Sequence, residues 1–213
     1  ADGFVQGKTT ADIVRSIRGT KAKGYSDGII EITRRDAQAI VRTALSHTAA
    51  AATRKTHEAN SDLIKGFVWL ATLDQRTSSQ CRIRDHKQYD KAHKPIGHSY
   101  PWGAGPGSLH WNCRSKSTPI LKSLKEITGL DIEDFEIDER ASMDGVVPGA
   151  TDYATWIKKQ SAARQDDVLG KSRAELLRKG DLSLADLYSA KGSPLTLDQL
   201  RERHAAAFRK AGL

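Results

Sequence analysis

Apolar residues follow a helical spacing through the first third of the chain. After Thr9 or Thr10 they recur at intervals of three and four, which predicts a short helix that stops at Gly19. A second run starts after Thr33, which with Asp36 resembles a capping box. We expect this second helix to continue to about residue 63 or 64, giving about 30 residues and a length of roughly 45 Å.

The hydrophobic pattern changes at Gly66, which we expect to break the long helix. Phe67–Leu73 is apolar on both faces, as a buried central strand would be. Thr77 with Gln80 then repeats the capping-box pattern and places Cys81 in the first turn of a short helix. Because a helix N-terminus lowers the pKa of a thiol, Cys81 is placed either to bind a metal or to react.

Residues 87–109 show little periodicity and are rich in glycine and proline. A loop this long inside a compact domain is usually functional or wraps a partner. Tyr100 and Trp102 are expected to anchor it to the core. Cys113–Ile120 predicts a strand that returns beside Phe67–Leu73.

The last third of the chain predicts a smaller helical unit. An acidic stretch at 131–139 is expected to be solvated, and residues 141–149 suggest a Gly/Pro hinge. Trp156 and Phe208 are expected in the core. Helix starts are predicted at three capping signals: Thr151, Ser172 and Thr196.

These elements define an α+β fold that is mostly helical, with a small central sheet, a long Gly/Pro loop, a long N-terminal helix and a C-terminal helical unit. We expect a core domain over residues 1–140 and a helical extension over residues 141–213.

Composition narrows the range of partners. Lys and Arg number 34 against 26 Asp and Glu, giving a net charge of +8 and a pI of about 9.5. That excess suits a polyanion such as DNA, although an ordinary basic protein would show it too. No run of about 18 apolar residues occurs, so no membrane-spanning segment is predicted. The start lacks a signal-peptide pattern, and an initial Ala1 fits a fragment or a processed product.

The candidate chemistry lies in the cysteines and histidines. His110 and Cys113 form a His-x-x-Cys pair, and with Cys81 they supply three ligands of the kind that zinc accepts. A structural zinc site needs a fourth ligand, and the candidates, in order, are Asp85, His86 and His98. Asp85 comes first because it lies one helical turn after Cys81. A metal-free, hydrogen-bonded cluster is the alternative, and two cysteines make a disulfide less expected in a reducing cytosol.

Two segments together carry a family pattern: TLDQRTSSQCRIRD and PIGHSYPWGAGPGSLHWNCRS. They resemble the phage Mu F-like head morphogenesis family, the minor head proteins of tailed phages. That family shows Leu-Asp-x-Arg-Thr-Ser-x-x-Cys, then an Asp-Gly-Lys turn, then a Pro/Gly loop ending in His-x-x-Cys-Arg. The matching positions here are Leu73, Asp74, Arg76, Thr77, Ser78, Cys81, Asp85, His110, Cys113 and Arg114.

The chain departs from the pattern at His86, where the family usually has glycine, and at Ser115, where many members have a second cysteine. The missing cysteine weakens the case for a complete zinc site. Outside the central motif the likeness continues upstream, around Arg42-Thr43-Ala44, and downstream, around Tyr153 and Trp156. The resemblance therefore extends over nearly the whole chain.

The resemblance implies a structural protein of the virion, in the capsid interior or at the portal vertex, assembled in the cytoplasm of a bacterial host. Its implied partners are the portal protein, the major capsid protein and packaged DNA, with self-association left open and no membrane involved. Contacts to DNA would go to phosphates without reading sequence. No enzymatic activity is expected, and a structural zinc ion is the one cofactor considered.

The alternative is a metal-dependent nuclease or another phosphotransfer enzyme built on Cys81, His110 and Cys113, with the histidine activating water beside a metal. A Cys81 nucleophile with His110 as its base is a second version. Asp74 and Asp85 are the only carboxylates we can nominate for either. Two arginines, Arg76 and Arg114, would either clamp a phosphate or pair with these carboxylates in a buried network.

Overall fold

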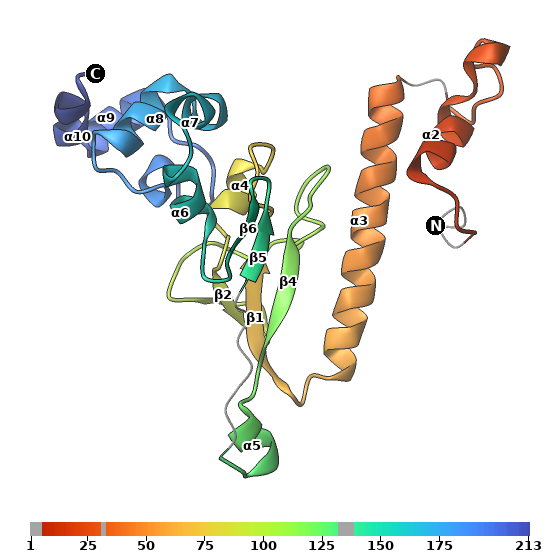
Figure 1. Cartoon of the computed structure of the whole chain (residues 1–213), viewed down its shortest axis with the longest axis horizontal. Helices are drawn as coiled ribbons and strands as arrows, with labels where there is room; N and C mark the ends of the chain where they lie inside the picture. Colours follow the sequence, from red (N-terminus) through yellow and green to blue (C-terminus); the bar gives the residue numbers. More distant parts are fainter. Residues whose placement is uncertain (1–5, 31–32, 132–138) are drawn as a thin grey trace. The chain divides into compact units, whose positions relative to one another are not determined.

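The computed structural model describes residues 6–30, 33–131 and 139–213 (Figure 1). Helices outweigh strands, and the expected α+β class is confirmed. The chain divides into two compact units, one formed by residues 1–61 with 103–116 and the other by residues 62–102 with 117–213. In the described part of the chain, no helix is long and apolar enough to cross a membrane.

The first unit contains two helices, α2 (Thr10–Arg18) and α3 (Arg34–Ala59). Thr9 caps α2 in a capping box with Asp12, as the sequence indicated. The helices pack through a small apolar cluster of Val14, Ala37 and Val41, with Ile13, Ile17 and Leu45 at its edge.

Helix α3 begins at the predicted cap, Thr33, whose hydroxyl accepts from the N–H of Asp36. It ends earlier than expected, at Asn60. There the side-chain amide of Asn60 donates to the carbonyl of Thr56 at 2.8 Å, so the side chain takes up a carbonyl of the last turn.

Residues 103–116 dock on α3. The hydroxyl of Ser46 donates to the carbonyl of Cys113 at 2.5 Å, and the N–H of Asn112 donates to the hydroxyl of Thr43 at 2.9 Å. A Cβ at Gly107 would come within 3.0 Å of the Cβ of Ala50. The thin, alanine-rich face of α3 therefore accepts this loop.

The second unit is built on a four-stranded sheet with the order β3-β2-β1-β4. Its strands are β1 (Ile64–Leu70), β2 (Gln88–Asp90), β3 (Pro95–Ile96) and β4 (Lys116–Leu121). Strand β4 confirms the predicted return beside β1, starting at Lys116 rather than Cys113. The β2–β3 pair corrects the expectation that residues 87–109 lack regular structure.

Gly66 lies inside β1, so its predicted role as a helix breaker is wrong. It pairs with Asp90 in the antiparallel β1–β2 register. A Cβ at this position would lie only 2.3 Å from the carbonyl oxygen of Tyr89. Gly66 therefore allows a close approach of two backbones, which is one of the ordinary uses of glycine in a strand.

Trp102 anchors the loop, as predicted. Its ring stacks on His93 with centroids 4.5 Å apart, and it meets Trp69 and Tyr89 edge-on at 5.4 and 4.8 Å. Such aromatic pairs add to the burial of their apolar area. Tyr100 is partly buried against the C-terminal hydrophobic cluster.

The remaining elements follow β4: α5 (Leu124–Thr128), β5 (Glu139–Ser142), β6 (Gly145–Pro148), α6 (Tyr153–Lys158), α7 (Ala162–Leu169), α8 (Lys171–Arg178), α9 (Leu197–Arg203) and α10 (Ala205–Ala211). Strands β5 and β6 pair as a hairpin where a hinge was expected. The expected boundary at residue 140 falls within β5, inside the second unit. Most of the acidic stretch, residues 132–138, lies outside the described residues.

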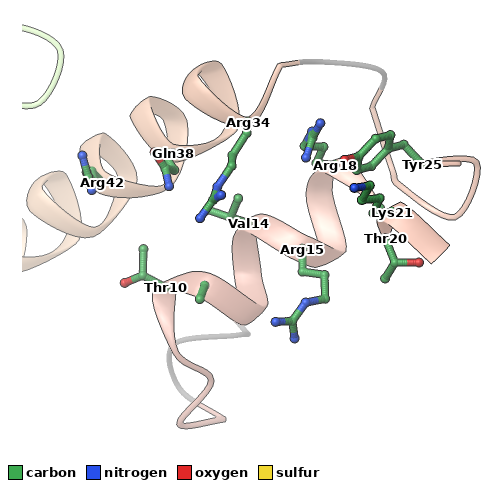
Figure 2. Close-up of a pocket in the computed structure, with 12 residues that line it drawn as sticks. Thr10, Val14, Arg15, Arg18, Thr20, Lys21, Tyr25, Arg34, Gln38 and Arg42 are labelled. Atoms are coloured by element: carbon green, nitrogen blue, oxygen red, sulfur yellow. The ribbon is translucent and has the colours of Figure 1, made fainter. Parts of the chain in front are cut away.

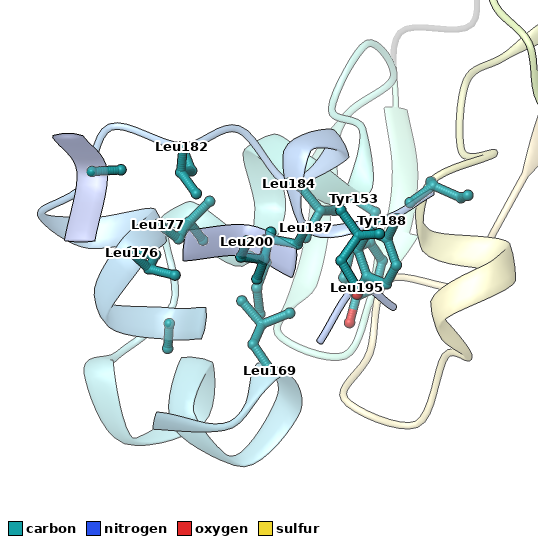
Figure 3. Close-up of a cluster of buried hydrophobic side chains, with 14 of the residues drawn as sticks. Tyr153, Leu169, Leu176, Leu177, Leu182, Leu184, Leu187, Tyr188, Leu195 and Leu200 are labelled. Atoms are coloured by element: carbon teal, nitrogen blue, oxygen red, sulfur yellow. The ribbon is translucent and has the colours of Figure 1, made fainter. Parts of the chain in front are cut away.

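The helices after β6 enclose the largest hydrophobic cluster, part of which Figure 3 shows. Trp156 and Phe208 belong to it, with exposed fractions of 2 % and 3 %, so their core placement is confirmed. The cap of α9 at Thr196 is also confirmed. Helices α6 and α8 instead start from Asp152 and Gly170, and α7 was not foreseen.

The contact at Gly66 can be tested by Gly66→Ala. The added methyl group must displace the backbone at Tyr89, so we expect the free energy of unfolding to fall by about 2–3 kcal/mol. Urea unfolding followed by tryptophan fluorescence measures the change. The neighbouring Lys65→Ala, at an exposed ion pair with Glu126, serves as the control and should cost less than about 1 kcal/mol. Equal stability of the two variants would contradict the close approach.

Candidate metal centre

Cys81 lies in the first turn of α4 (Ser79–Arg82) and is 2 % exposed. The cap of this helix is Ser78, whose hydroxyl accepts from the N–H of Cys81 at 3.3 Å. The predicted cap, Thr77, instead donates its hydroxyl to the carbonyl of Thr72 at 2.5 Å and lies 3.0 Å from a carboxylate oxygen of Asp74. The prediction that Cys81 lies in the first turn of a short helix is confirmed, and the N-cap is Ser78 rather than the predicted Thr77.

His110 and Cys113 are held together by a tight turn. The N–H of Cys113 donates to the carbonyl of His110 at 3.2 Å, and Asn112 takes a left-handed conformation with φ of 56°. The His110 Nδ1 lies 2.8 Å from the carbonyl oxygen of Trp111. The hydrogen bond to the Cys113 side chain raises the pKa of His110, and partial burial opposes that rise. Cys113 itself is 1 % exposed.

Cys81, His110 and Cys113 each offer one ligand atom, and these atoms all lie within 4.8 Å of one another. Zinc bonds to thiolate sulfur at about 2.3 Å and to imidazole nitrogen at about 2.0–2.1 Å, so the three atoms are close enough to hold one ion. Cys81 and Cys113 are not joined in a disulfide, so that alternative is not met. Two sulfurs and one imidazole nitrogen form a donor set that fits zinc.

The three nominees for a fourth ligand do not join this group in the described residues. His98 Nε2 lies 2.8 Å from the carbonyl oxygen of Gln88, so this ring is held at the β2 strand. His86 sits in a left-handed turn with φ of 60°, and burial lowers its pKa. Asp85, the first candidate for the fourth ligand, accepts hydrogen bonds from other groups instead.

Asp85 accepts hydrogen bonds at both carboxylate oxygens. The N–H groups of Ala71 and Tyr153 donate to it, each at 2.7 Å, and the Arg140 guanidinium donates to both oxygens at 3.0 and 3.2 Å. None of the Asp85 side chain is exposed. Its lone pairs are used by these donors, which is the physical reason why it is not available as a metal ligand.

Arg140 completes this buried network. Its guanidinium also donates to the carbonyls of Thr151 at 2.8 Å and of Ala71 at 2.5 Å. A buried ion pair for Asp85 was among the sequence-based alternatives, but with Arg76 or Arg114 as partner. Arg140 lies 55 residues from Asp85 along the chain, and no local spacing connects the two positions.

Burial raises the pKa of Asp85, whereas the hydrogen bonds and charge of Arg140 act in the opposite direction. Burial has the larger effect, so the pKa of Asp85 lies above its ordinary value despite the guanidinium beside it. A carboxylate in this state is a structural group, because its oxygens are enclosed and already hydrogen-bonded.

Comparison of the chain with family models, with curated proteins and with solved structures gave no significant match.

The Asp85–Arg140 pair predicts a pH-dependent effect of Arg140→Met. Without the guanidinium, a charged Asp85 is left buried, so we expect a loss of about 3–5 kcal/mol of unfolding free energy near neutral pH. Protonation of Asp85 removes that unpaired charge. The difference from the wild type should therefore shrink as the pH falls, and urea unfolding at about pH 8 and about pH 5 would measure it.

Arg164→Met is the matched control, since Arg164 pairs with Asp144 at a site where the two side chains are 32 % and 38 % exposed. This variant should lose less than about 1 kcal/mol at either pH. A deficit in Arg140→Met that is independent of pH would contradict a charged Asp85.

Proposed function

We propose that this chain is a minor head protein of a tailed bacteriophage, acting in head morphogenesis at or near the portal. Its partners would be the portal protein, the major capsid protein and packaged DNA, and it would reside in the virion. The proposal rests on the motif from Leu73 to Arg114 and on what its polar residues do in the fold.

The observation that carries a structural role is the way the motif's carboxylates are used. Both oxygens of Asp85 are taken by buried donors. Asp74 accepts from the N–H of Arg76 and the hydroxyl of Thr77, each at 3.0 Å. A nuclease needs carboxylates that face a metal or a water, and these two serve the backbone and a buried arginine. The motif is therefore better suited to hold a shape than to carry out chemistry.

The three-ligand group supports a structural zinc ion as part of the same proposal. Cys81, His110 and Cys113 would hold the ion, which would supply a crosslink between segments far apart in sequence. Because such ligands must be deprotonated and brought together, metal binding adds directly to folding stability. The fourth ligand would be a water or a group outside the described residues.

Zinc content and stability test this part of the proposal. We expect about one zinc per chain in the purified wild type by elemental mass spectrometry, and loss of both metal and thermal stability in Cys113→Ser and His110→Ala. His98→Ala is the control, because His98 lies outside the three-ligand group. If the folded wild type contains no metal, the zinc part of the proposal is wrong and the three residues form a hydrogen-bonded cluster.

The same variants separate the structural role from the nuclease alternative. If His110 activates water, His110→Ala should abolish DNA cleavage while the protein stays folded. If the cluster is structural, the wild type should show no cleavage above background with zinc, magnesium or manganese added, and His110→Ala should lower the melting temperature. Metal-dependent cleavage that His110→Ala removes without unfolding would overturn the structural proposal.

The location in the virion is tested by assembly. An epitope-tagged chain should be found in purified phage particles and should co-purify with the portal protein when the two are expressed together. Cys113→Ser should reduce incorporation if the metal cluster holds the binding-competent shape, whereas His98→Ala should be incorporated normally. Absence from particles, together with no retention by portal or capsid protein, would remove the proposed function.

A further inference from the structure

A cavity of about 580 Å³ opens beside α2 and α3 in the first unit. Among the described residues, its lining includes five cations and no carboxylate: Arg15, Arg18, Lys21, Arg34 and Arg42. In Figure 2, Arg34 extends from α3 toward Val14 of α2, and Arg18 lies beside the ring of Tyr25. A hollow with such a charge balance attracts anions.

The described carboxylates near this cavity already have hydrogen-bond or ion-pair partners. Asp12 caps α2 through Thr9 and pairs with Arg15 at 2.9 Å. Asp27 accepts from the N–H and hydroxyl of Thr20 at 2.7 and 3.0 Å. Asp36 accepts from the Thr33 hydroxyl at 2.7 Å. Of the five lining cations, Arg15 alone has an ion-pair partner in the described residues, which leaves the other four uncompensated there.

The position of Arg34 points to a ligand as well. It is the first residue of α3, where the helix dipole favours an acidic side chain and disfavours a cation. The open N–H groups of the first helical turn attract anions. An anion in the cavity would therefore be attracted by the N–H groups of the first turn of α3. Its negative charge would also offset the repulsion between Arg34 and the positive end of the helix dipole.

The arrangement fits a chain of phosphates better than one small anion. Arg34, Gln38 and Arg42 line the cavity at successive i, i+4 positions, so the two arginines are about 12 Å apart along α3. Nucleic-acid phosphates recur about every 3.4 Å per strand along a duplex axis. The row is thus long enough to meet more than one phosphate.

Tyr25 adds a group that a simple anion site would not need. The guanidinium of Arg18 lies 3.7 Å from the centroid of its ring, and the ring remains 38 % exposed. This cation–π contact holds the guanidinium of Arg18 in the lining of the cavity, where it can meet a phosphate.

We propose that the cavity lined by α2 and α3 is a binding site for the phosphate backbone of nucleic acid. Arg34 and Arg42 contact two separate phosphates, with Arg18 and Lys21 completing the cationic wall. This inference rests on the proposed contact with packaged DNA and assigns that contact to one surface.

The test is binding of a short fluorescent DNA duplex of arbitrary sequence, measured by anisotropy over a range of salt concentrations. We expect Arg34→Gln/Arg42→Gln to weaken binding at low salt roughly tenfold or more. The slope of log affinity against log salt should fall by about 2, one for each lost phosphate contact.

Arg35→Gln/Arg54→Gln is the matched control, since it removes the same charge from exposed positions of the same helix outside the cavity lining. It should change the slope and the affinity clearly less. Circular dichroism should give unchanged helicity and melting temperature for both variants, because all four positions are exposed.

Equal losses in the two double variants, or no loss in Arg34→Gln/Arg42→Gln, would overturn the site while leaving diffuse DNA contact in place. A wild type that binds no duplex at low salt would overturn both the site and the DNA part of the proposed function. Incorporation into particles would still decide whether the chain is a minor head protein. Binding to phosphatidylserine vesicles but not to DNA would assign the cavity to lipid headgroups and also overturn the proposal.

Discussion

The second unit depends on one buried ion pair. Asp85 follows α4 and Arg140 lies on β5, so the pair itself joins two segments. Its hydrogen bonds add two more, at Ala71 after β1 and at Thr151 and Tyr153 at the start of α6. Removing two charges from water costs several kcal/mol for each ion, and the cost is recovered only if all donors and acceptors are matched. Here the carboxylate receives four hydrogen bonds, so the pair holds these segments in one arrangement.

The same pair links the motif to the helices that follow it. Tyr153 donates its N–H to Asp85 and its hydroxyl to the carbonyl of Asp74, and its ring belongs to the large hydrophobic cluster. Arg82 adds a second link, donating to the carbonyls of Thr77 and Val168. Motif residues 73–85 are therefore fixed by partners far away in sequence. These distant partners explain why the polar residues Thr77, Arg84 and Asp85 are buried.

Local signals in the sequence predicted local structure well. The caps at Thr9, Thr33 and Thr196 depend on a hydrogen bond over three residues, so the pattern alone identifies them. The errors lie where a distant partner decides. Gly66 reads as a helix breaker until the backbone of Tyr89 is brought beside it, and Asp85 reads as a metal ligand until Arg140 is brought to it. Of the candidate site, the three sulfur and nitrogen ligands were predictable, and the role of Asp85 was not.

Charge is handled differently in the two units. In the second unit, Arg140, Arg164 and Arg178 each pair with a carboxylate, and Arg178 lies between Asp166 and Glu175 although it is partly exposed. In the first unit, Asp12 takes part in the cap of α2 and also pairs with Arg15, whereas Arg18, Arg34 and Arg42 have no ion-pair partner among the described residues. The positive charge of these first-unit arginines is therefore available to a polyanionic ligand.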